Sequence, residues 1–203
     1  MNISIFGATG DTGRKCCQRA LHSGYSVRAY SGSRTTIEGV DAITATPINL
    51  DDQDAVSDAV KGADVVISAI GGDQASRTAG LASIIQGCVA HRVRRLITVG
   101  GAGILPLPSG ELLSAQESFP SFLLNVTQAH YTAYQSLLES GLAWTVICPG
   151  TMRAGESQGE YRHQGELLLD QMRGVMYDDV AHLILRCAQE DLYVQQRVSI
   201  SNP

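Results

Sequence analysis

Short apolar runs alternate along the chain with longer stretches whose apolar residues recur at helical spacing. The short runs predict seven β-strands, at 2–6, 26–30, 44–48, 64–69, 94–99, 143–148 and 196–201. The longer stretches predict helices over about 11–23, 52–61, 78–91, 124–140 and 178–189. Strands that alternate with helices are typical of a doubly wound parallel sheet with right-handed crossovers. We therefore expect an α/β fold of about seven strands, in one domain that covers 1–203.

Two long segments interrupt this alternation, at 100–123 and 149–177. Each directly follows the C-terminal end of a predicted strand. Ligands of open α/β sheets bind at this edge, so we expect both loops to cover a substrate. The alternative is that they are inert connections.

A glycine-rich turn directly follows the first predicted strand. Residues 7–13 read Gly-Ala-Thr-Gly-Asp-Thr-Gly, which places three glycines at a spacing of three. In a turn that carries a diphosphate, Gly7 allows the sharp bend, Gly10 lets the backbone approach the phosphates, and Gly13 lets the helix pack closely. The helix N-terminus supplies N–H groups and a positive dipole end to the phosphates. We expect a dinucleotide site here, the alternative being an ordinary glycine-rich loop.

Composition narrows the choice of partners and compartment. The chain has 15 basic and 20 acidic residues, a net charge of −5, and no basic run, so nucleic acid is a poor candidate partner. No apolar run approaches the roughly 20 residues that span a bilayer, and the sequence starts directly with a predicted strand, so we expect no membrane span, no signal peptide and a cytoplasmic protein. The five cysteines form no CxxC pair and read as buried thiols in a reducing compartment. The five histidines lie at scattered spacings, and no metal site is expected.

Several motifs resemble those of the atypical short-chain dehydrogenases, a NAD(P)H-binding group with a Rossmann fold that includes NmrA-like proteins and biliverdin-IXβ/flavin reductase. The stretch 7–13 is similar to the GATGxTG signature of the group, and 140–150 (Ser-Gly-Leu-Ala-Trp-Thr-Val-Ile-Cys-Pro-Gly) resembles its sixth strand. The resemblance extends over nearly the whole chain. It implies that the cofactor contacts Gly7, Thr9, Gly10, Asp11, Thr12, Gly13, Asn49, Leu50, Ala69, Ile70, Gly71, Val99, Gly100, Pro149, Gly150, Thr151 and Met152.

The end of the second predicted strand favours NADP over NAD. NAD-specific sites place a carboxylate there for the ribose hydroxyls, and this chain has no acid between Asp11 and Glu38. Ser31, Ser33 and Arg34 instead offer hydroxyls and a guanidinium, which suit a 2′-phosphate. The alternative is that Arg34 is a solvated loop residue and the site accepts NAD and NADP alike.

The acid/base pair of the main short-chain dehydrogenases is missing. Those enzymes protonate a carbonyl with a tyrosine whose pKa is lowered by a lysine four residues later, helped by a serine after the fifth strand. Here Tyr131 is followed at that spacing by Gln135, and glycines occupy 100 and 101. The only two lysines, at 15 and 61, lie in the cofactor half. A lysine-activated phenol is therefore excluded.

His130 and Tyr131 are the remaining candidate catalytic residues. His130 occupies a position at which the resemblance places a histidine of the flavin reductase, and an imidazole there would donate a proton near neutral pH. The alternatives are a surface histidine, and for Tyr131 a packing residue or a contact to the nicotinamide ribose.

Two functions of different classes fit these observations. The first is an oxidoreductase that transfers hydride from NADPH to a small-molecule acceptor such as a flavin or a quinone, which can take its proton from solvent. The second is a non-catalytic NADP(H) sensor similar to the NmrA-like proteins, acting through a protein partner. Epimerase chemistry is disfavoured because it needs the missing acid/base pair.

Overall fold

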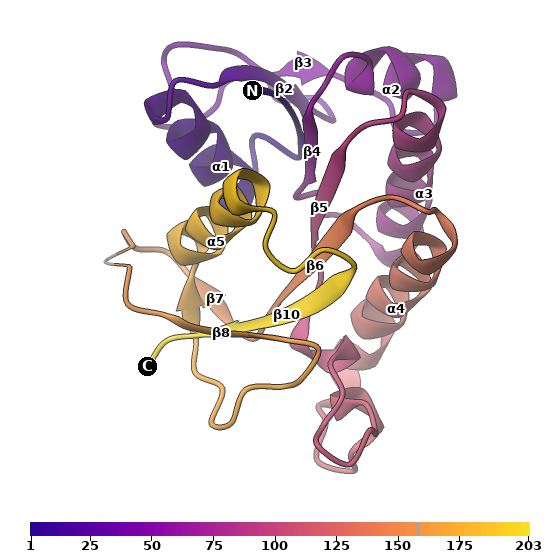
Figure 1. Cartoon of the computed structure of the whole chain (residues 1–203), viewed down its shortest axis with the longest axis vertical. Helices are drawn as coiled ribbons and strands as arrows, with labels where there is room; N and C mark the ends of the chain where they lie inside the picture. The colour runs from indigo at the N-terminus through magenta and orange to yellow at the C-terminus, as the bar shows by residue number, and fades with distance from the viewer. Residues whose placement is uncertain (158) are drawn as a thin grey trace.

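The computed structural model describes residues 1–157 and 159–203, apart from the side chain of Gln74, so residue 158 of the predicted loop 149–177 lies outside the described residues. One mixed sheet runs through the molecule (Figure 1). Its strands are β1 (Asn2–Phe6), β2 (Ser26–Ser31), β3 (Thr46–Pro47), β4 (Val65–Ser68), β5 (Arg95–Val99), β6 (Trp144–Pro149), β8 (Arg162–Gly165) and β10 (Gln196–Ser201). Two further strands, β7 (Met152–Arg153) and β9 (Val175–Met176), form a separate small sheet.

The eight strands follow the order β3-β2-β1-β4-β5-β6-β10-β8, which confirms the doubly wound fold. Every neighbouring pair is parallel except β10 and β8. The order reverses between β1 and β4, where Ile5 lies opposite Ile67. Such a reversal opens a crevice at the carboxyl ends of the strands.

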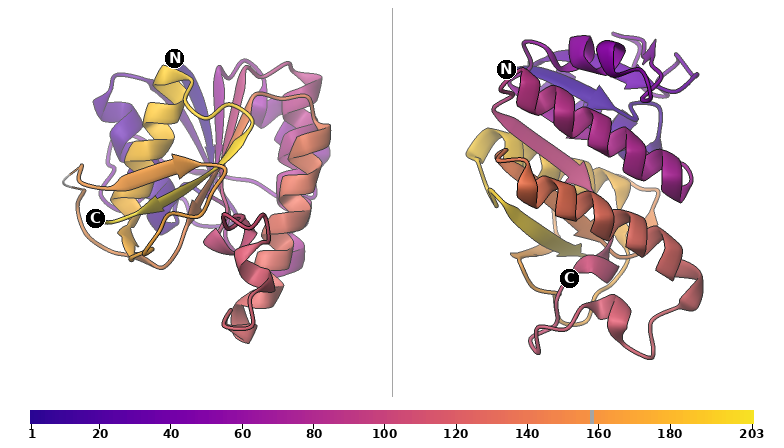
Figure 2. Two further views of the ribbon diagram at one scale, coloured as in Figure 1. Left: turned by 60° about the horizontal axis from the view of Figure 1, so that its bottom comes forward. Right: turned by 90° about the vertical axis from the view of Figure 1, so that its right-hand side faces the viewer.

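Five α-helices cover the two faces of the sheet: α1 (Asp11–His22), α2 (Gln53–Val60), α3 (Gln74–Ala90), α4 (Leu124–Glu139) and α5 (Tyr177–Glu190). Figure 2 shows α1 and α5 together on one face and α2, α3 and α4 on the other. Three short 3-10 turns, η1 (Ala102–Ile104), η2 (Leu113–Ala115) and η3 (Ser121–Leu123), lie in the predicted loop 100–123. No helix within the described ranges is long and apolar enough to cross a membrane.

The apolar strand residues alternate between two cores, one under each helical layer. In β4, Val65 and Ile67 pack toward α1 and α5, whereas Val66 packs toward α2, α3 and α4. Side chains of a strand alternate between faces, so a strand with helices on both sides reads as a continuous apolar run. All five cysteines are buried and unpaired, as predicted.

The strand prediction is wrong at the two edges of the sheet. The eighth strand, β8, lies inside the predicted loop 149–177 and pairs antiparallel with β10. Its sequence, Arg-His-Gln-Gly, is polar and half-buried throughout, so it carries no apolar alternation that would mark a strand. At the other edge, β3 spans only Thr46–Pro47 instead of 44–48, and Pro47 has no N–H to donate to a ladder.

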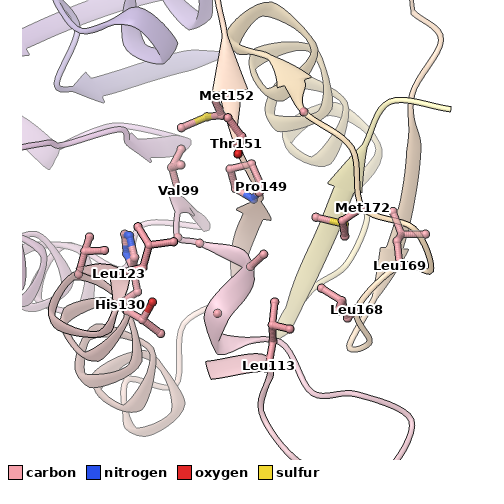
Figure 3. A pocket seen from close by; sticks show the side chains of 18 of the residues that line it. Val99, Leu113, Leu123, His130, Pro149, Thr151, Met152, Leu168, Leu169 and Met172 are labelled. Carbon is pink, nitrogen blue, oxygen red and sulfur yellow. The ribbon is translucent and has the colours of Figure 1, made fainter. Parts of the chain in front are cut away.

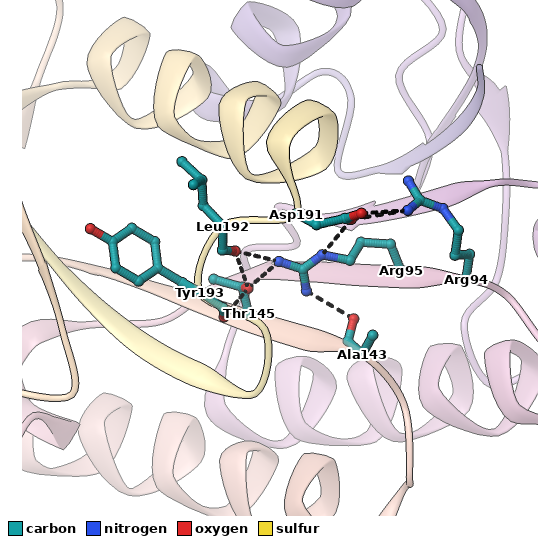
Figure 4. Close-up of polar contacts among 7 residues, drawn as sticks. All are labelled: Arg94, Arg95, Ala143, Thr145, Asp191, Leu192 and Tyr193. Atoms are coloured by element: carbon teal, nitrogen blue, oxygen red, sulfur yellow. Dashed lines mark hydrogen bonds and ion pairs between the residues drawn. The ribbon is translucent and has the colours of Figure 1, made fainter.

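Arg95, a buried arginine on β5, links two of the strands whose carboxyl ends border the crevice (Figure 4). Arg95 is 1% exposed, and its guanidinium donates to the carbonyl oxygens of Ala143 and Leu192 and to the hydroxyl of Thr145. Its Nε lies 4.0 Å from a carboxylate oxygen of Asp191. These contacts link β5 and β6 to the connection between α5 and β10.

Candidate functional site

The glycine-rich turn after β1 is fixed by its own backbone. Gly7 has a φ of +78°, and a Cβ there would lie 2.4 Å from the carbonyl oxygen of Ala69. A Cβ on Gly13 would lie 2.0 Å from the carbonyl oxygen of Gly7. Gly7 therefore excludes any larger residue because its φ is positive and the chain just after β4 lies against it. Gly13 excludes one because α1 packs directly on the turn.

Gly10 is different, because nothing in the protein requires it to be a glycine. It begins α1 with an extended backbone (φ −80°), and a Cβ there would meet only the carbonyl oxygen of Gly7, at 3.3 Å. Gly10, Asp11 and Thr12 border an open cavity, and the first N–H groups of a helix have no partner within the helix. A glycine that the fold does not need, at a helix N-terminus facing a cavity, fits a phosphate-binding turn.

The cavity has a volume of about 1100 Å³ and lies at the carboxyl ends of β4, β5 and β6 (Figure 3). It is bordered by segments that are far apart in the sequence but meet at this edge of the sheet. The predicted site residues that the structure brings together around it are Gly10, Asp11, Thr12, Ala69, Ile70, Gly71, Val99, Gly100, His130, Pro149, Gly150, Thr151 and Met152.

Apolar side chains that sequence reasoning did not single out form the outer part of the cavity. They come from the two predicted loops, 100–123 and 149–177, and both loops contribute to the cavity wall. Figure 3 labels Leu113 and Leu123 from the first loop, and Leu168, Leu169 and Met172 from the second. Phe122, at the rim, is 80% exposed. The spacing of these residues follows loop geometry rather than a helix or strand period, so no sequence pattern marked them.

The residues predicted to hold a 2′-phosphate lie outside the cavity. Ser33 and Arg34 are exposed after β2. Ser31 is buried, and its hydroxyl donates to the carbonyl oxygen of Arg34, so the expectation that this hydroxyl binds a phosphate is corrected. The backbone N–H of Ala8 donates to the carbonyl oxygen of Tyr30, which brings this end of β2 beside the glycine turn. The predicted cofactor residues Gly7, Thr9, Gly13, Asn49 and Leu50 also do not border the cavity.

His130 lies in the cavity wall next to a cation. Its Nε2 is 3.3 Å from Nη1 of Arg77, on the first turns of α3. A guanidinium only donates, so Nε2 accepts and the ring proton resides on Nδ1. Burial and then the charge of Arg77 lower the pKa of His130 from 6.5 to about 4. The expectation that His130 donates a proton near neutral pH is therefore corrected, because the imidazole is neutral there.

The glycines at 100 and 101, where the main short-chain dehydrogenases have a serine, each lie close to a neighbouring side chain, and Gly101 leaves room for the imidazole of His130. A Cβ on Gly101 would lie 3.3 Å from Cδ2 of His130, and one on Gly100 would lie 2.7 Å from a methyl group of Val146. A serine at either position would displace a neighbour.

Among the described residues, no group of three or more histidine, cysteine, aspartate or glutamate side chains is arranged to hold a metal ion.

Tyr131 points away from the cavity. It is half-buried in the core beneath α4, with its ring 6.1 Å from that of Tyr134, which in turn contacts Trp144 edge to face. It does not border the cavity. The structure therefore supports the packing interpretation of Tyr131 rather than a catalytic role.

A Tyr131→Phe variant tests this placement. We expect it to keep any turnover within about tenfold of the wild type, a barrier change of roughly 1.4 kcal/mol, because the hydroxyl does not face the cavity. Steady-state kinetics with NADPH measures the effect. Complete loss of activity in a folded variant would assign the phenol a role that this structure does not explain.

These features define a nucleotide-binding protein with a doubly wound fold and a cavity at the switch point of its sheet. The sequence profile of the NAD(P)H-binding family matches residues 7–191, and the chain belongs to that family. Its resemblance to the atypical short-chain dehydrogenases is thereby confirmed at the level of the family.

Solved structures with the same fold cover the whole chain. A candidate exported protein from Burkholderia pseudomallei is 27% identical, with a TM-score of 0.87 over 99% of each chain. A candidate NADH-flavin reductase from Streptococcus pneumoniae is 21% identical, with a TM-score of 0.86 over 100% of each chain. A short-chain dehydrogenase/reductase from Veillonella parvula, solved in complex with NADP, is 19% identical, with a TM-score of 0.77 over 100% of this chain and 94% of its own.

Proposed function

We propose that the protein is an NADPH-dependent reductase that transfers hydride to a flavin, a quinone or a similar planar acceptor. One observation carries the proposal: a single cavity joins the N-terminus of α1 to an apolar wall built by the two loops after β5 and β6. A volume of about 1100 Å³ exceeds what one drug-sized ligand fills, so part of a nucleotide and a second molecule fit in it together.

The composition of the cavity favours an acceptor that needs no acid from the protein. Its walls contain no lysine within the described part of the chain, and Tyr131 lies outside it. His130 is neutral at pH 7. Flavins and quinones accept hydride at an electrophilic centre and can take a proton from solvent, so positioning against the nicotinamide is the main task of the site. Leucine, phenylalanine and methionine side chains suit the flat apolar face of such a ring.

Arg34 supports the choice of NADP. It is exposed three residues after β2, a strand whose C-terminal end lies beside the glycine-rich turn, and NAD-specific sites carry an acid at that strand end. We expect Arg34→Ala to weaken NADPH binding by about 1.5–3 kcal/mol, or roughly 10- to 100-fold, and to leave NADH binding nearly unchanged. Calorimetry with both nucleotides measures this difference. Arg28→Ala is the control, because Arg28 lies on β2 itself and its side chain donates to the carbonyl oxygen of Lys61. Equal losses for NADPH and NADH would remove Arg34 from the site.

A non-catalytic NADP(H) sensor is the second candidate function. It is favoured by the absence of the tyrosine-lysine pair and by the placement of Tyr131 in the core. In that case the exposed Phe122 at the cavity rim would respond to nucleotide binding and alter contacts with a protein partner.

Oxidation of NADPH in the presence of FMN, menadione, and a simple aldehyde separates the two candidates. The reductase predicts turnover with FMN or menadione and none with the aldehyde, whose reduction needs an acid/base pair. Tight NADPH binding without turnover of any of the three would favour the sensor.

A further inference from the structure

Arg77 is a cation in the wall of the cavity, and no sequence motif pointed to it. It lies on α3, is half-buried, and borders the cavity together with His130. Figure 3 shows His130 beside Leu123. Because Arg77 contacts His130, its guanidinium lies at that same place.

The guanidinium has hydrogen-bonding capacity left over. Of its five N–H groups, one points at Nε2 of His130 and one donates to the carbonyl oxygen of Gly72, at 3.0 Å. Its Nε is buried and not accessible from the cavity, so the N–H groups left for a ligand are the second ones on Nη1 and Nη2. The carboxylate of Asp73 accepts from the backbone and hydroxyl of Ser76. Burial lowers the pKa of Arg77, and the negative charge of Asp73 nearby acts in the opposite direction.

The other charged groups at the cavity are engaged elsewhere or exposed. Arg173 donates to the carbonyl oxygen of Pro203 at the C-terminus. Asp11 pairs with Arg14 on the surface of α1. The side chain of Asp170 is exposed. Among the described residues that line this cavity, Arg77 is therefore the half-buried cation, and a charge in that position attracts an anion more strongly than one in water.

We propose that Arg77 binds the anionic oxygen that a planar acceptor develops when it takes a hydride, which makes it a catalytic residue of the reductase. This inference rests on the proposed function. The C–H bond at C4 of the dihydronicotinamide breaks, and its hydrogen moves with both electrons to the acceptor, forming a new C–H, N–H or O–H bond. The nicotinamide is oxidised, and the reduced acceptor holds one additional negative charge in its conjugated system until solvent supplies a proton. Arg77 donates N–H groups to the oxygen that carries this charge.

His130 acts through Arg77 as a positioning residue. A neutral imidazole with an accepting Nε2 holds one arm of the guanidinium, and the carbonyl oxygen of Gly72 holds the other. Both direct partners of the guanidinium are neutral, whereas a carboxylate bonded directly to it would cancel its charge. His130 thus orients the guanidinium, and Arg77 supplies the positive charge that binds the anionic oxygen.

Single-turnover kinetics with FMN and NADPH tests the catalytic part. Arg77→Met should lower the rate of hydride transfer by about 100-fold, in the range found when one oxyanion donor is removed, while the dissociation constant of NADPH changes less than about threefold. Arg77→Lys, which keeps the charge but loses the planar fork, should recover part of the rate. Arg28→Met is the matched control and should behave as wild type. A normal rate for Arg77→Met would overturn the inference.

Binding without turnover separates this inference from the proposed function. In the complex with NADP⁺, the anion of 2-hydroxy-1,4-naphthoquinone should bind about tenfold or more weakly to Arg77→Met than to wild type, and neutral menadione should bind equally to both. Thermal unfolding confirms that the variant is folded. Equal binding of the anion to both proteins would overturn the role of Arg77 even if the wild type is active. An inactive wild type that still prefers the anion through Arg77 would overturn the reductase but keep the anion site.

Discussion

Gly10→Val should abolish tight NADPH binding, with a loss of about 100-fold or more, and leave the protein folded. The fold tolerates the change because the backbone at Gly10 is extended and a Cβ there would meet only one atom, at 3.3 Å. The added methyl groups would occupy the space above the N-terminus of α1, where the pyrophosphate would approach the backbone. Fluorescence titration with NADPH and thermal unfolding measure the two properties separately.

Gly13→Ala is the control that shows the opposite behaviour. Its Cβ would lie 2.0 Å from a backbone carbonyl oxygen of Gly7, so α1 must move away from the turn. We expect a strongly lowered melting temperature for this variant. Wild-type NADPH affinity in a folded Gly10→Val protein would show that the nucleotide does not bind at this turn.

Mild acid should destabilise the protein through His130. Its pKa is about 4 in the folded state and about 6.5 when unfolded, because burial and Arg77 oppose the charged form. The unfolded chain therefore binds the proton first. This contribution to the free energy of unfolding is complete above pH 6.5 and is lost as the pH falls toward 4, by roughly 3 kcal/mol in total.

Denaturant unfolding at several pH values, compared with His130→Gln, isolates this effect. Glutamine cannot titrate, but its side-chain oxygen can still accept from Arg77. We expect the variant to lose less stability than the wild type between pH 6.5 and 4, by roughly 3 kcal/mol. The same change at His22, which is exposed at the end of α1, is the matched control. Parallel pH profiles for wild type and His130→Gln would refute the buried, neutral state of His130.

The sequence predicted the parts of the site that local physics determines. The spacing of Gly7, Gly10 and Gly13 identified the turn, because its tight geometry excludes side chains at fixed positions. The apolar runs located the central strands for a similar reason, since those strands are buried on both faces. Edge strand β8, polar and half-buried, has no such signature.

What the sequence missed depends on contacts between distant residues. The pKa of His130 is set by burial and by Arg77, which is 53 residues away along the chain. The hydroxyl of Ser31 faces a backbone carbonyl oxygen rather than solvent, which its place at the end of a strand does not reveal. The apolar wall is built by two long loops, whose course no periodicity encodes. The protonation state of His130, the direction of the Ser31 hydroxyl and the shape of the apolar wall therefore depend on tertiary contacts, which the local sequence does not reveal.

The central claim is that one cavity holds NADPH and a planar acceptor together, so that hydride passes directly between them. The most direct test is rapid mixing of the protein and FMN, under anaerobic conditions, with NADPH deuterated at the transferred position. We predict that flavin reduction saturates with NADPH concentration and is slowed by deuterium, because the C–H bond breaks inside a ternary complex. Tight nucleotide binding with no reduction of FMN or of menadione would contradict the account.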